Sequence, residues 1–281
     1  MSTASAPGGA TVAVVTRPGD GGQRLSGALR DRGQGALWWP AFDLLAPAEL
    51  EPLQHLLGRL GEFDLAVFVS AAAVRGLAAL DLCGQWPAGT AVSAVGASTL
   101  ELARRVLPGA AAARGVGLAR DSGSSGSEAL WEALQREPAL PRRVLIVRAE
   151  TGREWLGERL REAGCGVQYA SVYRRVVHSP SGEQRAALEA CRGAQQRAVP
   201  VVTSSEAVAA LDRQLGQAPE ARAWLRQGLA LCPHPRIEQT LRAAGYVEVG
   251  QCELSAAGVL AAIADLRGHE SGPRPAQAGA R

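Results

Sequence analysis

Small hydroxyl residues stand at several points where an apolar run gives way to a helical pattern. They are Thr16, Ser70, Ser98, Thr99, Thr203, Ser204 and Ser205, and Gly96 ends a run in the same way. Each of them has an ordinary explanation as a helix cap, because serine and threonine are favoured there. Helix N-termini also carry unpaired N–H groups and a positive dipole, which bind carboxylates and phosphates. The repetition of the pattern indicates a site for an anionic ligand.

Two arginines extend this pattern. Arg17 and Arg148 each end an apolar run, and they stand 131 residues apart. The same offset pairs further residues: Leu25 with Leu156, Leu29 with Leu160, and Gly33 with Gly164. A guanidinium can clamp an anion through two parallel hydrogen bonds, although a surface ion pair is an equally ordinary role for either residue. The offset predicts an internal repeat of a strand, an arginine and a helix.

Other kinds of chemistry find little support. The four histidines are far apart, and only His234, between Cys232 and Arg236, follows an apolar run at a suggestive place. A metal site there lacks further ligands, so we expect no metal. No G-x-G-x-x-G or G-x-S-x-G motif occurs, which weakens a nucleotide-binding or hydrolase interpretation. The sequence contains no lysine, which excludes P-loop NTPases, pyridoxal-phosphate Schiff-base enzymes and protein kinases.

Charge and cysteine usage narrow the class of protein. The 30 basic residues, all arginine, against 27 acidic ones give a net charge of +3, most of it in the last fifteen residues. We therefore expect no nucleic-acid partner. The five cysteines are scattered and odd in number, which is typical of reduced thiols. Neither a signal peptide nor a membrane span is recognisable, so a cytoplasmic protein is expected.

The elements that must position these residues form a regular series. Apolar runs fall at residues 11–15, 65–69, 91–95, 144–147, 167–172, 199–202, 229–231 and 246–249, with amphipathic stretches between them. Most runs lack polar alternation, which predicts parallel strands buried on both faces with helices as crossovers. The chain has 281 residues, enough for two domains. Since ligands bind beyond the carboxyl ends of parallel strands, the site is expected there, in a cleft between two similar α/β lobes.

Several segments, taken in order, resemble the uroporphyrinogen-III synthase family. These are Thr16-Arg17-Pro18, residues 68–74, residues 94–99, Ser127-Glu128-Ala129-Leu130, residues 145–153, Val172-Tyr173-Arg174-Arg175, residues 202–205 and His234-Pro235-Arg236-Ile237. The resemblance covers roughly residues 12–266. It implies an α/β fold of two flavodoxin-like lobes with parallel sheets, joined by a two-stranded linker ladder. Lobe 1 would comprise residues 12–39 and 177–266, and lobe 2 residues 40–176, with disordered ends at 1–11 and 267–281.

The resemblance also implies a function. The substrate would be hydroxymethylbilane, a linear tetrapyrrole with eight carboxylates, which is dehydrated and cyclised to uroporphyrinogen III with the last pyrrole inverted. The resemblance implies no metal and no organic cofactor. Tyr173 would assist the departing hydroxyl, although it can equally well be a packing residue of the ladder. Ala71, His234 and Arg236 join the hydroxyl residues and arginines above as substrate-binding candidates. A monomer is expected, with transient contact to hydroxymethylbilane synthase. The competing interpretation is a non-catalytic two-lobe protein that binds a small anion.

Overall fold

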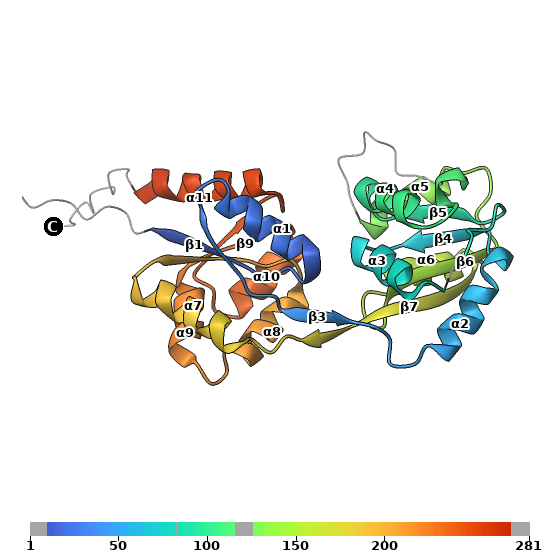
Figure 1. Ribbon diagram of the computed structural model, residues 1–281. Helices are drawn as coiled ribbons and strands as arrows, with labels where there is room; N and C mark the ends of the chain where they lie inside the picture. Colours follow the sequence, from blue (N-terminus) through green and yellow to red (C-terminus); the bar gives the residue numbers. More distant parts are fainter. Residues whose placement is uncertain (1–9, 83, 116–125, 271–281) are drawn as a thin grey trace, which may run out of the picture. The chain divides into compact units, whose positions relative to one another are not determined.

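The computed structural model describes residues 10–82, 84–115 and 126–270, and the chain divides into two compact units (Figure 1). Unit 1 contains the described residues up to Asp43 and those from Val177 onward. Unit 2 contains Leu44–Val176. The chain crosses between the units within β3 (Phe42–Leu45) and at the end of β7 (Gly166–Val177), and these two strands are neighbours in one sheet. The first crossing lies four residues later than the boundary predicted at residues 39/40.

Unit 1 is built on a five-stranded sheet in the order β10-β9-β8-β1-β2. Its strands are β1 (Thr11–Val15), β2 (Gly35–Trp38), β8 (Arg197–Val201), β9 (Leu229–Cys232) and β10 (Glu248–Gln251), and all the pairs are parallel. Its helices are α1 (Gly19–Arg30), α7 (Gly182–Gly193), α8 (Ser205–Gln214), α9 (Pro219–Gln227), α10 (Pro235–Ala243) and α11 (Ala256–Glu270). Helices α1 and α11 pack on one face of the sheet, and α7, α8, α9 and α10 on the other.

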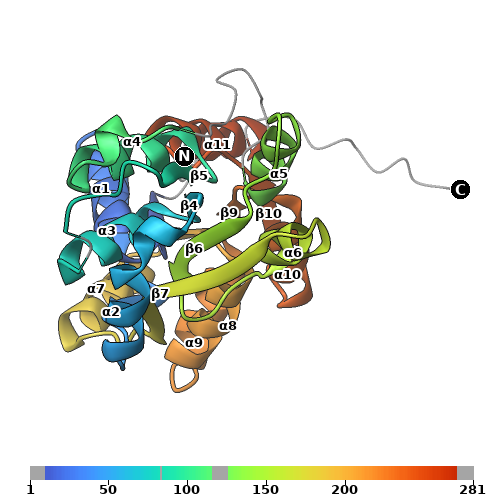
Figure 2. The ribbon, with the colours of Figure 1, turned by 90° about the vertical axis from the view of Figure 1, so that its right-hand side faces the viewer.

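Unit 2 has a second five-stranded sheet, in the order β3-β7-β6-β4-β5. Beside β3 and β7 it contains β4 (Leu65–Phe68), β5 (Ala91–Ala94) and β6 (Arg143–Ala149). Its helices are α2 (Glu51–Gly58), α3 (Ala71–Leu80), α4 (Ala97–Val106), α5 (Ser127–Gln135) and α6 (Trp155–Glu162), with short 3₁₀ turns at Leu60–Glu62 and Ala110–Ala112. Figure 2 shows α3 and α4 on one side of the strands and α5 and α6 on the other, each side with its own buried core.

The predicted architecture is confirmed. Strands β1, β4, β5 and β9 are buried along their whole length, which explains why their sequences lack polar alternation. Two strands were missed. β2 is short and begins at a glycine, and β3 is only half-buried and contains a charged residue, so neither has the apolar run of a covered strand. The last strand, expected at residues 246–249, runs two residues later, because Tyr246 belongs to the turn after α10 and packs in the core.

The predicted ends also need correction. Thr11, assigned to a disordered N-terminus, pairs with Arg197 as the first residue of β1. Helix α11 continues through Glu270, so residues 267–270 are not part of a tail, since an established helix extends by one hydrogen bond per added residue. Residues 1–9 and 271–281 of the two predicted tails lie outside the described residues.

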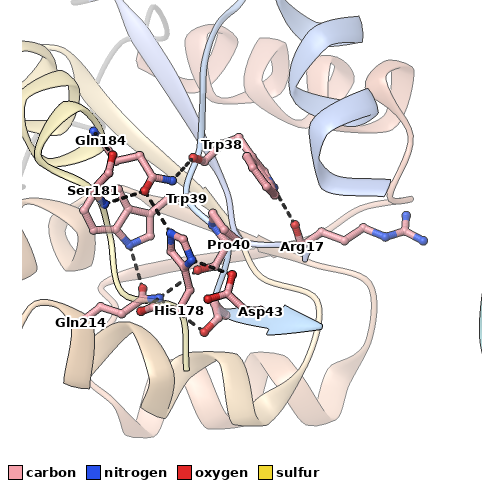
Figure 3. A network of polar contacts seen from close by, with 10 residues as sticks. Arg17, Trp38, Trp39, Pro40, Asp43, His178, Ser181, Gln184 and Gln214 are labelled. Atoms are coloured by element: carbon pink, nitrogen blue, oxygen red, sulfur yellow. Dashed lines mark hydrogen bonds and ion pairs between the residues drawn. The ribbon is translucent and has the colours of Figure 1, made fainter. Parts of the chain in front are cut away.

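A polar network in unit 1 fixes the chain where it leaves β2 (Figure 3). The buried amide of Gln214, the last residue of α8, accepts a hydrogen bond from Trp39 Nε1 at 2.8 Å and donates to the carbonyl of Pro40 at 2.9 Å and that of His178 at 3.0 Å. His178 contacts oxygens through both ring nitrogens: Asp43 Oδ1 at 2.8 Å and Gln184 Oε1 at 3.0 Å. The unit 1 residues just before the first crossing and just after the second are therefore joined to each other by hydrogen bonds.

Candidate active site

The clearest cluster of predicted site residues lies in unit 2, at the carboxyl end of its sheet. Ser70 is the N-cap of α3, and its hydroxyl accepts a hydrogen bond from Ala73 N at 3.1 Å. The phenol oxygen of Tyr173, on β7, lies 3.5 Å from the same hydroxyl. Ala71 is the first residue of the helix. The structure thus brings Ser70, Ala71 and Tyr173 together beside the positive end of a ten-residue helix.

An irregularity in β7 accompanies this placement of Tyr173. Arg148 of β6 pairs with Ser171, but the next residue, Ala149, pairs with Tyr173, so Val172 is an extra residue. A bulge of this kind redirects side chains. Val172 is buried in the core beneath α3, and Tyr173 packs against the same core although the two are adjacent in the sequence. The bulge is the reason that Tyr173 faces α3 and reaches Ser70.

The start of α4 lies at the same end of the sheet, since β4 and β5 are parallel neighbours. Gly96 is the N-cap and lies in extended backbone, and Ser98 is exposed in the first turn. Thr99 is 8% exposed and faces the core. Direct contact of the Thr99 side chain with a ligand is therefore not supported. Gly96 is partly exposed and Ser98 is exposed, so a ligand can reach both.

Unit 1 has a comparable set at the carboxyl ends of β8 and β9. Ser204 caps α8 by accepting from Ala207 N at 3.2 Å, and Ser205 accepts from the hydroxyl of Thr240 at 3.1 Å. Thr203, just before the cap, is partly exposed.

The neighbouring helix of unit 1, α10, is capped by a histidine. His234 Nδ1 accepts from Arg236 N at 3.1 Å. Because Nδ1 accepts in this cap, the ring N–H that can serve a ligand is the one on Nε2. His234 and Arg236 are both exposed. Unit 1 thus contributes two helix N-termini at this end of its sheet.

Thr16 and Arg17 follow β1 in unit 1 and differ in exposure. Thr16 is fully buried, and its hydroxyl donates to Val201 O at 2.9 Å, so it joins β1 to β8 and its side chain is not available to a ligand. Arg17 is partly exposed; its carbonyl accepts from Trp38 Nε1 at 3.0 Å, and its side chain points away from the polar network (Figure 3). A Cβ on Gly22 would lie 1.8 Å from that carbonyl, so only glycine fits there.

Arg148 requires a correction. It was predicted to clamp an anion, but it is 5% exposed, and its guanidinium carbon lies over the ring of Tyr169, 4.9 Å from the centroid. Its Nε donates to Ala149 O at 3.1 Å, and its Nη1 lies 3.7 Å from a carboxylate oxygen of Glu154. A guanidinium covered in this way is engaged inside unit 2.

Cysteine and metal chemistry find no support in the described part of the chain. Burial raises the pKa of the Cys232 thiol, which therefore stays protonated and is a poor nucleophile. Among the described residues no group of three or more His, Cys, Asp or Glu side chains could hold a metal ion. No described helix is both long and apolar enough to cross a membrane.

The sequence analysis missed two features that help to position the site residues, Gly157 and the bulge at Val172. Gly157, in α6, has a detectable signal, because an isolated glycine inside a helical pattern often marks close packing. A Cβ there would lie 2.0 Å from the hydroxyl of Tyr169. The bulge at Val172 has no such signal, because valine is common in regular strands.

Comparisons with known proteins identify relatives along most of the chain. The family model described as uroporphyrinogen-III synthase HemD matches residues 23–253. The uroporphyrinogen-III synthase of Salmonella typhimurium is 29% identical over 240 residues, which are 84% of this chain and 92% of that protein. The one from Escherichia coli is 28% identical over the same length and with the same coverage.

Solved structures agree on the fold. A uroporphyrinogen III synthase variant from Thermus thermophilus aligns over 92% of this chain and 99% of its own, with a TM-score of 0.55 and 18% identity. The uroporphyrinogen-III synthetase of Helicobacter pylori aligns over 92% and 99%, with a TM-score of 0.56 and 16% identity. These structures support the fold, whereas the family model and the curated relatives identify the family. This chain belongs to the uroporphyrinogen-III synthase family.

Proposed function

We propose that the chain closes hydroxymethylbilane to uroporphyrinogen III at the carboxyl ends of its parallel strands, with Tyr173 assisting the departing hydroxyl group. The observation that carries the proposal is the contact between Tyr173 and the cap of α3, 3.5 Å between the two hydroxyl oxygens. It places a phenol, which can donate a proton, beside a helix N-terminus, which attracts carboxylates.

The carboxylates of the substrate would bind at helix N-termini and at Arg17. Ser70, Gly96, Ser204 and His234 each begin a helix of nine or ten residues. Each start leaves N–H groups without intrahelical partners, and a carboxylate can accept from them. Thr203, Ser205 and Arg236 stand next to these caps. Eight carboxylates on one substrate would make several weak sites act together.

The reaction would begin with loss of the hydroxyl group from the first ring. The Tyr173 hydroxyl would donate its proton to that oxygen, which leaves as water, and the ring becomes an azafulvene cation. The last ring then attacks through its substituted carbon to form a spiro intermediate, which fragments and recloses with that ring inverted. Finally the ring carbon loses a proton, which balances the proton given by Tyr173 and restores its phenol. No oxidant, reductant or cofactor enters this balance.

Selecting the right carbon for attack is a problem of orientation. Holding a flexible chain so that one carbon lies closest to the cation is worth several kcal/mol in favourable cases. Unassisted closure at the unsubstituted carbon would give the type I isomer. Positioning by many carboxylate contacts therefore matters more here than acid–base strength.

The alternative, a non-catalytic anion-binding protein, is not favoured, because the family model and each relative described above are named for the synthase. We further propose that the protein acts as a monomer in the cytoplasm and receives its short-lived substrate by transient contact with hydroxymethylbilane synthase. The instability of the open tetrapyrrole supports such a transfer. Catalysis without a metal stays a prediction.

Replacement of Tyr173 by phenylalanine tests the proposed role. Tyr173→Phe should lower kcat by up to about 10²-fold, the low end for general acid assistance, because an azafulvene forms readily from an electron-rich pyrrole. The product should remain mainly type III, since the carboxylate contacts are unchanged. Tyr246→Phe, in the core of unit 1, is the matched control and should leave kcat unaltered. A folded Tyr173→Phe variant with the parental kcat would show that Tyr173 is structural.

A further inference from the structure

Residues 149–154 comprise the last residue of β6 and the loop that follows it, and are called the loop here. The buried side chain of Arg148 contacts both ends of this loop. The Arg148 side chain is buried. Its Nε donates a hydrogen bond to Ala149 O, and its Nη1 lies 3.7 Å from a carboxylate oxygen of Glu154. These two contacts lie at the two ends of the loop. A buried guanidinium cannot lose its charge, so it stabilises the fold only if the chain around it keeps these partners in place.

The conformation of the loop leaves room for the guanidinium. Gly152 has a φ of 153°, a backbone conformation that side-chain-bearing residues rarely adopt. A Cβ at this position would lie 3.3 Å from Arg148 Nη2, tighter than an ordinary contact. The loop therefore passes closely over the arginine, and glycine permits both the turn and the approach.

An aromatic ring, that of Tyr169, packs against the Arg148 guanidinium. The ring of Tyr169 lies under Arg148, with 4.9 Å between the guanidinium carbon and the ring centroid, which is cation–π distance. Tyr169 in turn lies against α6 at Gly157, where a Cβ would meet its hydroxyl at 2.0 Å. Arg161 lies over the same ring at 5.1 Å and donates to the Tyr169 hydroxyl at 3.4 Å, but its side chain is exposed.

The loop held by Arg148 reaches directly to Tyr173. Glu150 N donates to Tyr173 O at 2.9 Å, and Ala149 is the residue paired with Tyr173 after the bulge. Two residues further along β7, Arg175 Nη2 donates to Thr151 O at 3.3 Å. The backbone of Tyr173 is thus fixed by the loop, and its phenol reaches Ser70 from this backbone position.

We propose that Arg148 is a positioning residue for the reaction: it holds loop 149–154 in the conformation that fixes Tyr173, and it does not bind substrate. The proposal rests on the role of Tyr173 proposed above. It assigns the arginine to the orientation of the phenol rather than to a carboxylate of the tetrapyrrole, the role that its place after a buried strand first indicated.

Arg148→Met tests this assignment, because methionine fills the space without a guanidinium and removes a buried charge, a change that folds often tolerate. Misplacing a catalytic group by an ångström costs roughly 10²-fold, so kcat should fall about ten- to hundredfold. KM should stay within about twofold, because an interaction with a substrate carboxylate is not lost. Amide hydrogen exchange should become faster in residues 149–154. Arg161→Met, which removes the other arginine on Tyr169, is the matched control and should leave kcat unchanged.

A double variant separates positioning from general damage. In a Tyr173→Phe background, Arg148→Met should cause no further loss of kcat, since the effects of groups that act as a unit, here through the loop, are not additive. An equal loss in both backgrounds, or a raised KM with the parental kcat, would overturn the proposal. The parental kcat in Tyr173→Phe alone would instead refute the role proposed for Tyr173.

A second variant covers the case that Arg148→Met does not fold. Tyr169→Leu removes the platform beneath the guanidinium and keeps the arginine. It should lower kcat with little change in KM, and the effect should again vanish in the Tyr173→Phe background. An unchanged kcat in Tyr169→Leu would overturn the proposal.

Discussion

Two arginines at matching places in the chain, Arg17 and Arg148, differ in burial. Arg17 is partly exposed just before α1, so its guanidinium is within reach of a ligand. Arg148 is covered by its own loop and by Tyr169. A guanidinium at the surface can exchange its present contacts and water for a carboxylate, whereas a covered one has its hydrogen bonds committed. The two residues match in the internal repeat, and the structure distinguishes them by burial.

Removing the Arg17 guanidinium should weaken substrate binding. Arg17→Ala should raise KM about tenfold with kcat nearly unchanged, since a charge-assisted hydrogen bond lost equally from ground and transition states affects binding alone. Arg24→Ala is the control, because Arg24 is an exposed arginine of α1, the helix that follows Arg17, and pairs only loosely with Asp20, at 3.9 Å. Steady-state kinetics on both variants decide the matter. A tenfold loss of kcat at constant KM would contradict a binding role for Arg17.

Tyr246 should make the fold sensitive to alkali. Burial, reinforced by the negative charge of Asp212, raises its pKa to about 12. The unfolded chain releases this proton near pH 10, so the native state binds more protons between the two values, and stability falls as pH rises from about 10 to 12. Tyr246→Phe should flatten this part of the curve of unfolding free energy against pH. Parallel curves for the variant and the parent would refute the explanation.

At the scale of elements, the chain between β2 and β3 is held by side-chain hydrogen bonds in addition to backbone ones, such as Trp39 N to Val15 O and Ala41 N to Thr16 O. The side-chain amide of Gln214 makes hydrogen bonds to Trp39, Pro40 and His178 (Figure 3). Since these partners are buried or partly buried, losing the amide strands several polar groups at once. This explains how a segment without regular structure keeps a defined path where the chain leaves unit 1.

Gln214→Ala should therefore destabilise unit 1 by about 3 kcal/mol, given roughly 1–3 kcal/mol for each orphaned buried group. Denaturant unfolding followed by tryptophan fluorescence measures the change, because Trp39 is itself in the network. Gln168→Ala, at an exposed position of β7, is the control and should change stability by less than about 0.5 kcal/mol. A similar loss in both variants would mean that the network adds nothing beyond helix and strand propensity.

Element prediction from the sequence worked where burial is two-sided and failed where it is not. The run at residues 65–69 predicts β4 well, because every residue of that strand is covered. β3 contains Asp43 and is only half-buried, so its sequence resembles a loop. The bulge at Val172 and the burial of Arg148 depend on how β6, β7 and α6 pack together, and no local pattern records such packing.

At the scale of the whole molecule, each unit presents helix N-termini at the carboxyl end of its own sheet. In unit 2 these are the starts of α3 and α4, and in unit 1 those of α8 and α10. The internal repeat in the sequence predicts this duplication, because matching hydroxyl residues follow β4 and β8. A substrate with carboxylates along its whole length suits a protein with two such sets.

Isomer analysis of the product tests the central claim most directly. The purified protein is mixed with hydroxymethylbilane freshly made by its synthase, and the uroporphyrinogens are oxidised and separated by isomer. The account predicts type III as the main product, formed much faster than spontaneous closure, because the protein orients the last ring so that its substituted carbon attacks. Type I product alone, at the spontaneous rate, would contradict it.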